Sequence, residues 1–382
     1  MSDGQQLGPN RRLIGVRGSR ARLTTPALVL DLDRFERNLT AMARYCRDAG
    51  LELRPHAKTH KCSAIAGKQI EAGAVGVCCA TLREAEAMVA GGVRGVHITS
   101  PVVGDDRIER LAALNIRAHD LMIVVDNPAN ARDIEAAVRR TGRPLRALVD
   151  VDVGMSRTGV ASGQDALALA RQLAESEELE YCGIQGYSGR VQHINDIEER
   201  RRVYGDQMQR FAAIKSILTQ DGLEPEIVTG GGTGTFGIDR TLGVLTEHQA
   251  GSYIFMDVEY NLVHIFEERK TPFETTLFMR NTVVSANAGG FVTIDGGFKC
   301  FATDGPLPEI ASGAPAGARY DYFGDEHGRI VFANGHDQMP VGAGVEIVTP
   351  HCDPTVNLHD WYHVVRGDTL LDIWPIDARG VL

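Results

Sequence analysis

From about residue 27 the sequence alternates between short apolar runs and longer amphipathic stretches, and this alternation restricts the fold more than any other feature. The strand-like runs are ALVLDL, LELRP, GVCCA, GVHIT, LMIVVD, LRALVDVDV, YCGIQGY, EIVTGGG and GSYIFMD. Between them lie helix-like stretches such as DRFERNLTAMARYCRDAG, and glycine often follows these, as it does at helix C-termini. Eight strand–helix units in about 220 residues predict an α/β fold, a (β/α)8 TIM barrel. One of the nine strand candidates must therefore lie outside the barrel.

The pattern changes near residue 265. The segments ETTLFMRNTVVSA, GFVTIDGG, YDYFGDE, GRIVFAN, GVEIVTP, WYHVVRG and TLLDIWPI are short, alternating and separated by turn residues. This is typical of an antiparallel β domain. Since no low-complexity linker separates the two halves, we expect them to pack together.

Charge and cysteine usage exclude several classes of partner. The 382 residues carry a formal net charge of −10 and no long Lys/Arg run, which argues against a nucleic-acid partner. RRLIGVRGSRAR is basic but short, and is either a solvated arm or a packed strand. No apolar stretch approaches the ~20 residues that span a bilayer, and the N-terminus has no apolar signal core. Seven scattered cysteines without a CxxC pair indicate reduced, buried thiols and a cytoplasmic protein.

Lys58, in LRPHAKTHKC, directly follows the strand-like run LELRP. In a barrel this position is the C-terminal end of a strand, where catalytic groups lie. The alternative is an ordinary surface charge. Arg157, Tyr187 and His193 follow two later strands on the same predicted face, and each is otherwise a structural residue that caps a loop.

TGGGTGT, residues 229–235, follows a late strand, where barrels commonly bind phosphate. Glycines there let backbone N–H groups approach a phosphate, and threonine hydroxyls add donors. The alternative interpretation of these residues is an ordinary turn that binds no phosphate. A lysine on the same face as a phosphate cradle favours a Schiff base with pyridoxal phosphate.

PHCDPTVNLHD is the second unusual stretch. In an extended segment residues i and i+2 face the same way, so His351 and Asp353 can share one metal while Cys352 points elsewhere. Histidine with carboxylate suits Mg²⁺ or Mn²⁺, whereas a His/Cys pair favours Zn²⁺. A polar loop with local Asx turns is the remaining alternative.

Together these segments resemble the D-threonine aldolase/3-hydroxy-D-aspartate aldolase group, which are pyridoxal-phosphate enzymes of the alanine racemase class (fold type III). The resemblance covers nearly the whole chain, from TPALVLDLDRFERNL to WPIDARG, and rests on RPHAKTHKC, VDVGMSRTGV, TGGGTGT, AGSYIFMD, DEHG and HCDPTVNLHD. It implies that ALVLDL belongs to the β domain, which accounts for the ninth strand. The implied domains are a cofactor-binding barrel at 33–263 and a β domain at 1–32 and 264–382 that carries the metal site. The fold class also implies a homodimer.

The resemblance implies roles residue by residue. Lys58 holds the cofactor, Arg157 and Tyr187 flank its ring, and His193 is a base near the substrate hydroxyl. The residues implied around the phosphate are Thr229, Gly231, Gly232, Thr233, Gly251, Ser252 and Tyr253. His351 and Asp353 match metal ligands, for manganese or magnesium. DEHG, Asp325 to Gly328, matches a family stretch to which we assign no role.

Some positions depart from the aldolases. Ala80 stands where those aldolases have glutamine, and Ser188 where D-threonine aldolases have histidine. Related D-serine dehydratases carry cysteine and zinc at the second ligand position, where this chain has Asp353. Asp353 is the aldolase-like choice, whereas Ala80 and Ser188 predict weak selectivity for D-threonine itself.

The predicted activity is metal-assisted cleavage of a β-hydroxy-D-α-amino acid to glycine and an aldehyde. A dehydratase acting on the same substrates would instead release ammonia and a keto acid. A racemase has no need of the metal motif, and a non-catalytic cofactor carrier has no need of the β domain. A barrel with an unrelated function is the remaining alternative.

Overall fold

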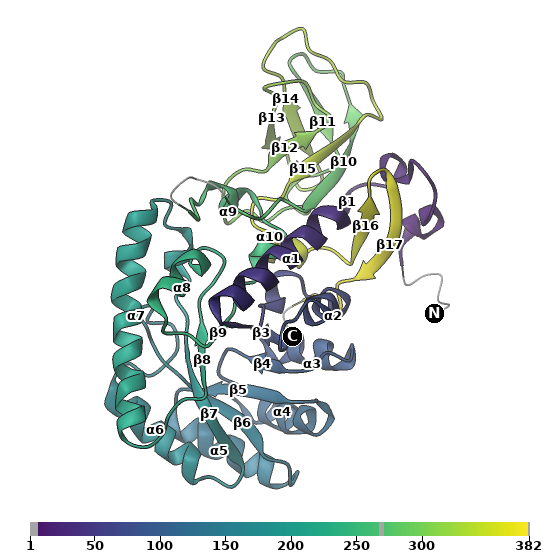
Figure 1. Cartoon of the computed structure of the whole chain (residues 1–382). Helices are drawn as coiled ribbons and strands as arrows, with labels where there is room; N and C mark the ends of the chain where they lie inside the picture. The colour runs from purple at the N-terminus through teal and green to yellow at the C-terminus, as the bar shows by residue number, and fades with distance from the viewer. Residues whose placement is uncertain (1–6, 267–270, 381–382) are drawn as a thin grey trace.

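The computed structural model describes residues 7–266 and 271–380. Within this part of the chain, eight parallel strands with surrounding helices form one body, and a mostly antiparallel sheet of nine strands forms the other (Figure 1). None of the described helices is both long and apolar enough to cross a membrane.

The parallel strands are neighbours in the order in which they occur along the chain. They are β2 (Glu52–Leu53), β3 (Val77–Cys79), β4 (Val96–Ile98), β5 (Leu121–Val125), β6 (Leu145–Asp150), β7 (Leu179–Gly186), β8 (Ile227–Gly230) and β9 (Glu247–His248). β9 pairs with β2, and the Cys78 amide donates to the Pro55 carbonyl at 2.9 Å, which joins the chain after β2 to β3. These contacts close the sheet, and the predicted TIM barrel is confirmed.

Helices follow the barrel strands, and several of them begin at a residue whose side chain caps the helix. They are α2 (Ser63–Glu71), α3 (Leu82–Ala90), α4 (Asp105–Arg117), α5 (Pro128–Arg139), α6 (Gly163–Glu175), α7 (Ile197–Gln220) and α8 (Phe236–Leu242). At the start of α3, for example, the Thr81 hydroxyl accepts a hydrogen bond from the Glu84 amide at 3.2 Å. Where such a cap is present, it fixes the end of the strand-to-helix loop.

The strand predicted at GSYIFMD is wrong. Ser252–Ile254 forms a short 3-10 helix, η5, and the eighth barrel strand is β9, just before it. Tyr253, Ile254 and Phe255 are all fully buried, and a short run that is buried on every side has no periodicity that separates strand from helix. β9 itself is polar because Glu247 pairs with Arg54 inside the barrel, whereas His248 pairs with Asp239 of α8 at 2.9 Å.

The second body is built around β1 (Ala27–Asp31), which lies between β10 (Leu277–Ser285, antiparallel) and β16 (Trp361–Arg366, parallel). This confirms that the N-terminal strand belongs to the β sheet, and α1 (Leu32–Ala49) then leads to the barrel (Figure 1). The other strands are β11 (Phe291–Ile294), β12 (Glu309–Ser312), β13 (Arg319–Tyr322), β14 (Gly328–Val331), β15 (Gly344–Val348) and β17 (Thr369–Pro375).

Two features of this body were not predicted from the sequence. β12 was not predicted, because most of its residues are exposed and lack an apolar alternation. The basic segment near the N-terminus is neither strand nor free arm. It forms two short 3-10 helices, η1 (Pro9–Leu13) and η2 (Ser19–Arg22), and Arg20 of η2 pairs with Glu346 at 2.7 Å.

A chain of polar side chains crosses the barrel interior. Arg54 pairs with Glu247 at 2.9 Å, and the two side chains are only 5% and 4% exposed. Glu247 also accepts from the Thr229 hydroxyl at 2.9 Å, and Gln249 donates to that hydroxyl at 3.0 Å. Gln249 in turn donates to Gln185 at 3.1 Å. Such a buried network is favourable only while every member keeps its partner.

We expect Arg54→Met to lower the free energy of unfolding by about 3–5 kcal/mol, because it leaves the Glu247 carboxylate buried without its cation. The double variant Arg54→Met/Glu247→Met removes both charges and should recover most of this loss. Urea unfolding of the three proteins measures the effect. A single variant that costs less than about 1 kcal/mol would contradict the assignment of a buried charge pair.

Candidate functional site

A cavity of about 150 Å³ lies at the C-terminal ends of the barrel strands. Lys58, Arg157 and Tyr187, which come from three different strand ends, all line it. The Arg157 guanidinium lies 5.7 Å from the centre of the Tyr187 ring. The remaining lining residues are His56, Ala80, Thr99, Ser100, Gln185, Gly189 and Gln249. Gln185 and Gln249 were not predicted as site residues, and the only signal for Gln185 was its polarity at the apolar end of β7 (Leu179–Gly186).

Lys58 lies in η3 (Ala57–Thr59), directly after β2, and forms an ion pair with Asp353. Burial by itself would lower the pKa of Lys58, but the Asp353 carboxylate and the nearby Tyr187 raise it above its ordinary value. Burial would raise the pKa of Asp353, but Lys58 and then His351 hold it well below its usual range. The two side chains are therefore a charged pair, and this pair joins the barrel to the β sheet.

The loop after β8 is folded tightly. The Gly232 amide donates to the Thr235 hydroxyl at 3.1 Å, and the Gly234 amide donates to Gln192 at 2.9 Å. No described residue accepts a hydrogen bond from the Thr233 amide. The Thr229 hydroxyl, by contrast, is occupied by Glu247 and Gln249, so it has no free proton for a phosphate.

The segment after β9 reaches the same loop. The Tyr253 amide donates to the Thr233 hydroxyl at 3.0 Å, whereas the Tyr253 hydroxyl accepts from Gln69 at 3.3 Å. No described residue accepts from the Ser252 amide. A Cβ at Gly251 would lie 2.7 Å from the Thr59 hydroxyl oxygen, so only glycine lets this segment approach η3 so closely. The backbone of 251–253, more than its side chains, therefore faces the loop.

We expect Gly231→Ala to destabilise the loop. Gly231 has φ +72°, which costs an L-residue about 1–2 kcal/mol, and its Cβ would lie 2.7 Å from Nε2 of His248. The free energy of unfolding should fall by at least this amount, and cofactor affinity should fall with it. Gly205→Ala is the matched control, because that glycine lies within α7 with open space around it and alanine favours helix. Equal stability of the two variants in urea would contradict this.

A second cluster surrounds His351. Nδ1 of His351 lies 2.8 Å from Asp304 and 3.8 Å from Glu259. The other oxygen of Glu259 lies 3.2 Å from Nδ1 of His193. Burial, and then the nearby His351, lower the pKa of His193. The sequence analysis identified the two histidines but not Glu259, which lies in α9 (Val258–Leu262), or Asp304.

The extended geometry predicted for residues 351–353 is wrong. His351 is extended, but Cys352–Val356 forms a short helix, α10, that begins directly after it. The Asp257 carboxylate accepts from the Cys352 amide at 2.7 Å and holds the start of this helix, with the Cys352 side chain fully buried. Within residues 7–266 and 271–380, no group of three or more His, Cys, Asp or Glu side chains is arranged to hold a metal ion.

The two departures from the aldolases lie in different surroundings. Ala80 lines the cavity that contains Lys58, the lysine cavity. Ser188 is buried, and its hydroxyl has no hydrogen-bond partner among the described residues. Asp325 and Gly328 lie at the turn between β13 and β14, in the β sheet, where the Asp325 carbonyl accepts from the Lys299 amide at 3.0 Å.

Two family models match the chain. Residues 30–258 match the alanine racemase N-terminal domain, and residues 276–365 match a putative serine dehydratase domain. The two matches divide the chain where the barrel gives way to the sheet.

Curated proteins and a solved structure match over nearly the full length. A D-threonine aldolase from Arthrobacter sp. is 40% identical over 94% of this chain and 94% of its own. A 3-hydroxy-D-aspartate aldolase from Paracoccus denitrificans is 34% identical over 94% of this chain and 92% of its own. The crystal structure of D-threonine aldolase from Filomicrobium marinum superposes with a TM-score of 0.90 at 39% identity, covering 94% of this chain and 96% of that one.

Proposed function

Because this chain belongs to the pyridoxal-phosphate-dependent family that contains D-threonine aldolase and 3-hydroxy-D-aspartate aldolase, we propose that it cleaves β-hydroxy-D-α-amino acids to glycine and an aldehyde. The observation that carries the proposal is Lys58, which lies at the mouth of the barrel in one cavity with Arg157 and Tyr187. The domain division at 33–263, with 1–32 and 264–382 as the second domain, is part of the same proposal.

The residues fit pyridoxal phosphate. Lys58 supplies the amine for covalent attachment, and Arg157 and Tyr187 supply a cation and an aromatic face beside it. The Thr233 and Ser252 amides, which have no acceptor among the described residues, together with the close-packed Gly231, Gly232 and Gly251, suit a phosphate. Tyr253 contributes its backbone, which lies against this loop. The Thr229 hydroxyl is not among the proposed phosphate donors, because it already donates to Glu247. When bound, the cofactor acts as an electron sink for negative charge at Cα.

His193 is the proposed base for the β-hydroxyl proton. Burial lowers its pKa, so the ring is neutral near pH 7, which is the form that accepts a proton. With Glu259 beside Nδ1 at 3.2 Å, the Nδ1 proton is held there and Nε2 is left as the basic atom. Loss of the hydroxyl proton and breakage of Cα–Cβ give the aldehyde, and Cα then gains a proton to give glycine.

His351 and Asp353 are the proposed ligands of a divalent ion, Mn²⁺ or Mg²⁺. Imidazole nitrogen and carboxylate oxygen are suitable donors for either, and Glu259 and Asp304 beside His351 add negative charge. Asp353 pairs with Lys58, so a divalent ion held by this carboxylate would compete with the lysine. Such an ion supplies Lewis acidity, which lowers the pKa of a hydroxyl group.

The serine dehydratase match over the β sheet makes a dehydratase the second candidate. Incubation with a panel of β-hydroxy-D-amino acids, with glycine and ammonia measured together, separates the two. We expect glycine and aldehyde in equal amounts and no ammonia. Ammonia with a keto acid, and no glycine, would replace the aldolase with the dehydratase.

A homodimer in the cytoplasm completes the proposal. Large apolar side chains on the β-sheet body are exposed, among them Leu307 (50%) and Phe323 (48%), and a partner subunit would cover such a surface. All seven cysteines are free and buried, as in a reducing compartment. Light scattering should give twice the mass of the 41.5 kDa chain, and a monomer mass at working concentration would contradict the dimer.

A further inference from the structure

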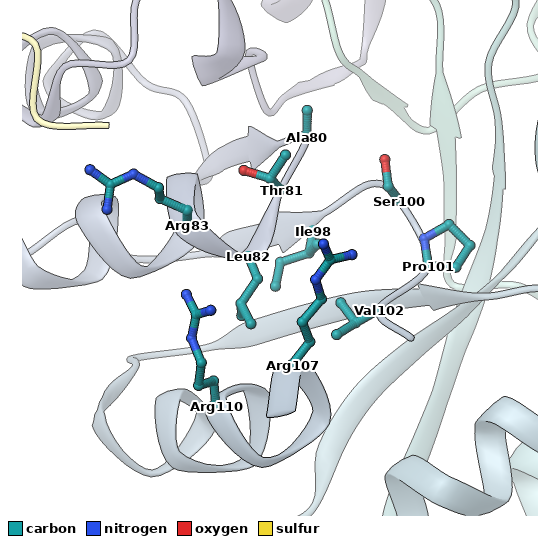
Figure 2. A pocket seen from close by; sticks show the side chains of 10 residues that line it. All are labelled: Ala80, Thr81, Leu82, Arg83, Ile98, Ser100, Pro101, Val102, Arg107 and Arg110. Carbon is teal, nitrogen blue, oxygen red and sulfur yellow. The ribbon is translucent and has the colours of Figure 1, made fainter. Parts of the chain in front are cut away.

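A second cavity, of about 330 Å³, adjoins the lysine cavity. Figure 2 shows the residues that line this second cavity. The two cavities share Ala80, which follows β3, and Ser100, which lies two residues beyond β4. Ala80 and Ser100, with a methyl and a hydroxymethyl side chain, therefore form the junction between the two cavities.

The wall of the second cavity is apolar next to this junction. Leu82, Ile98, Pro101 and Val102 line it, and Figure 2 shows them around the space between β4 and α4. Burying methylene groups against such a wall is favourable, whereas a methyl substituent would remain in the lysine cavity and leave this wall unused.

The cationic side chains of this cavity differ in what they already bind. Arg110 holds the Glu86 carboxylate with two hydrogen bonds, at 3.0 and 2.6 Å. Arg83 donates to the Arg379 carbonyl at 3.1 Å. Arg107, which rises from the first turn of α4 in Figure 2, makes no hydrogen bond or ion pair with any described residue. It is therefore available to pair with a ligand carboxylate through two parallel N–H donors.

We propose that the second cavity is a subsite for the β-substituent of the substrate, and that it selects a short alkyl chain ending in a carboxylate, which Arg107 binds. This deepens the proposed function and rests on it. The substrate class is a β-hydroxy-D-α-amino dicarboxylic acid in which methylene groups separate the distal carboxylate from Cβ. Breaking Cα–Cβ, with loss of the hydroxyl proton and gain of one proton at Cα, gives glycine and an aldehyde that carries the distal carboxylate.

Three D-configured probes test the proposal: 3-hydroxy-2-aminoadipate, its 6-amide and threonine. The diacid and the amide have the same shape and differ in the distal charge, and threonine does not reach the second cavity. We expect kcat/KM for the diacid to exceed that for the amide by about 2- to 5-fold, because Arg107 is exposed and solvent screens an exposed charge pair. Arg107→Met should remove this preference and leave threonine cleavage within about 2-fold.

Arg110→Met is the matched control, since Arg110 lines the same cavity but already binds Glu86, and it should keep the preference for the diacid. Ala80→Leu should lower kcat/KM for both long probes relative to threonine, because leucine fills the junction. Equal kcat/KM for diacid and amide, or a preference that survives Arg107→Met, overturns the subsite while leaving the aldolase intact. Failure of all three probes to give glycine instead overturns the aldolase itself, and the subsite with it.

Discussion

Replacing Lys58 with alanine is expected to lower kcat by about 10³-fold or more, because no other described lysine lines the barrel cavity and covalent attachment of the cofactor is lost. Borohydride reduction of the wild-type holoenzyme should fix the cofactor to the peptide that contains Lys58. The variant should lose both this label and the visible absorbance of the attached cofactor.

Because Lys58 also pairs with Asp353, a second variant is needed to separate loss of activity from loss of stability. Lys58→Ala leaves Asp353 buried without its cation, so part of its effect will be on stability. Lys58→Arg keeps a positive charge beside Asp353, and we expect it to fold like the wild type and still be inactive. Lys299→Ala is the control: this lysine is exposed and pairs with Glu326, so activity and labelling should be unchanged. A borohydride label on Lys61 or Lys299 would contradict the assignment of Lys58.

Asp353→Asn should weaken metal binding by at least about 100-fold and lower kcat by about 10²- to 10⁴-fold. The carboxamide keeps the shape of the side chain but loses the charge that a divalent ion requires. Replacing even a residue that contacts a metal ligand, and not the metal itself, lowers metal affinity by about 10- to 100-fold. Metal content of the dialysed protein and the Mn²⁺ dependence of glycine formation measure the two effects.

Cys352→Ala is the discriminating control for the metal site. The Cys352 side chain is fully buried and the Asp257 carboxylate accepts from its amide, so alanine keeps the start of α10 in place. We expect metal binding and activity to remain, with a stability loss of about 1 kcal/mol from the small cavity. Zinc bound through Cys352, or loss of the metal in this variant, would contradict the choice of Asp353.

The sequence predicted the elements that have a strong periodic signal. The βα alternation was sufficient for the barrel, because each unit buries one apolar strand beneath one amphipathic helix. β9 was missed for the opposite reason: it has two residues, both polar, and its place is set by Glu247 pairing with Arg54 across the interior. Long-range contacts of this kind leave no local pattern.

Residues of the candidate site could be predicted where a charged or aromatic side chain follows the end of a strand in the sequence. Lys58, Arg157 and Tyr187 each follow a strand end, so parallel strands bring them to one face. Glu259 and Asp304 could not be found in this way, since their meeting with His351 depends on how the sheet packs against the barrel. The same holds for the geometry of α10, because the start of this helix is fixed by Asp257 from a distant part of the chain.

The fate of the Cα hydrogen tests the central claim most directly. A β-hydroxy-D-amino acid that carries deuterium at Cα should give glycine that retains this deuterium and gains one hydrogen from water, because an aldolase breaks Cα–Cβ and leaves Cα–H intact. A dehydratase or racemase must break the Cα–deuterium bond. Mass spectrometry of the products decides: singly deuterated glycine with an equal amount of aldehyde is the predicted result. Ammonia with a keto acid, or recovered substrate that has lost its label without glycine formation, would contradict it.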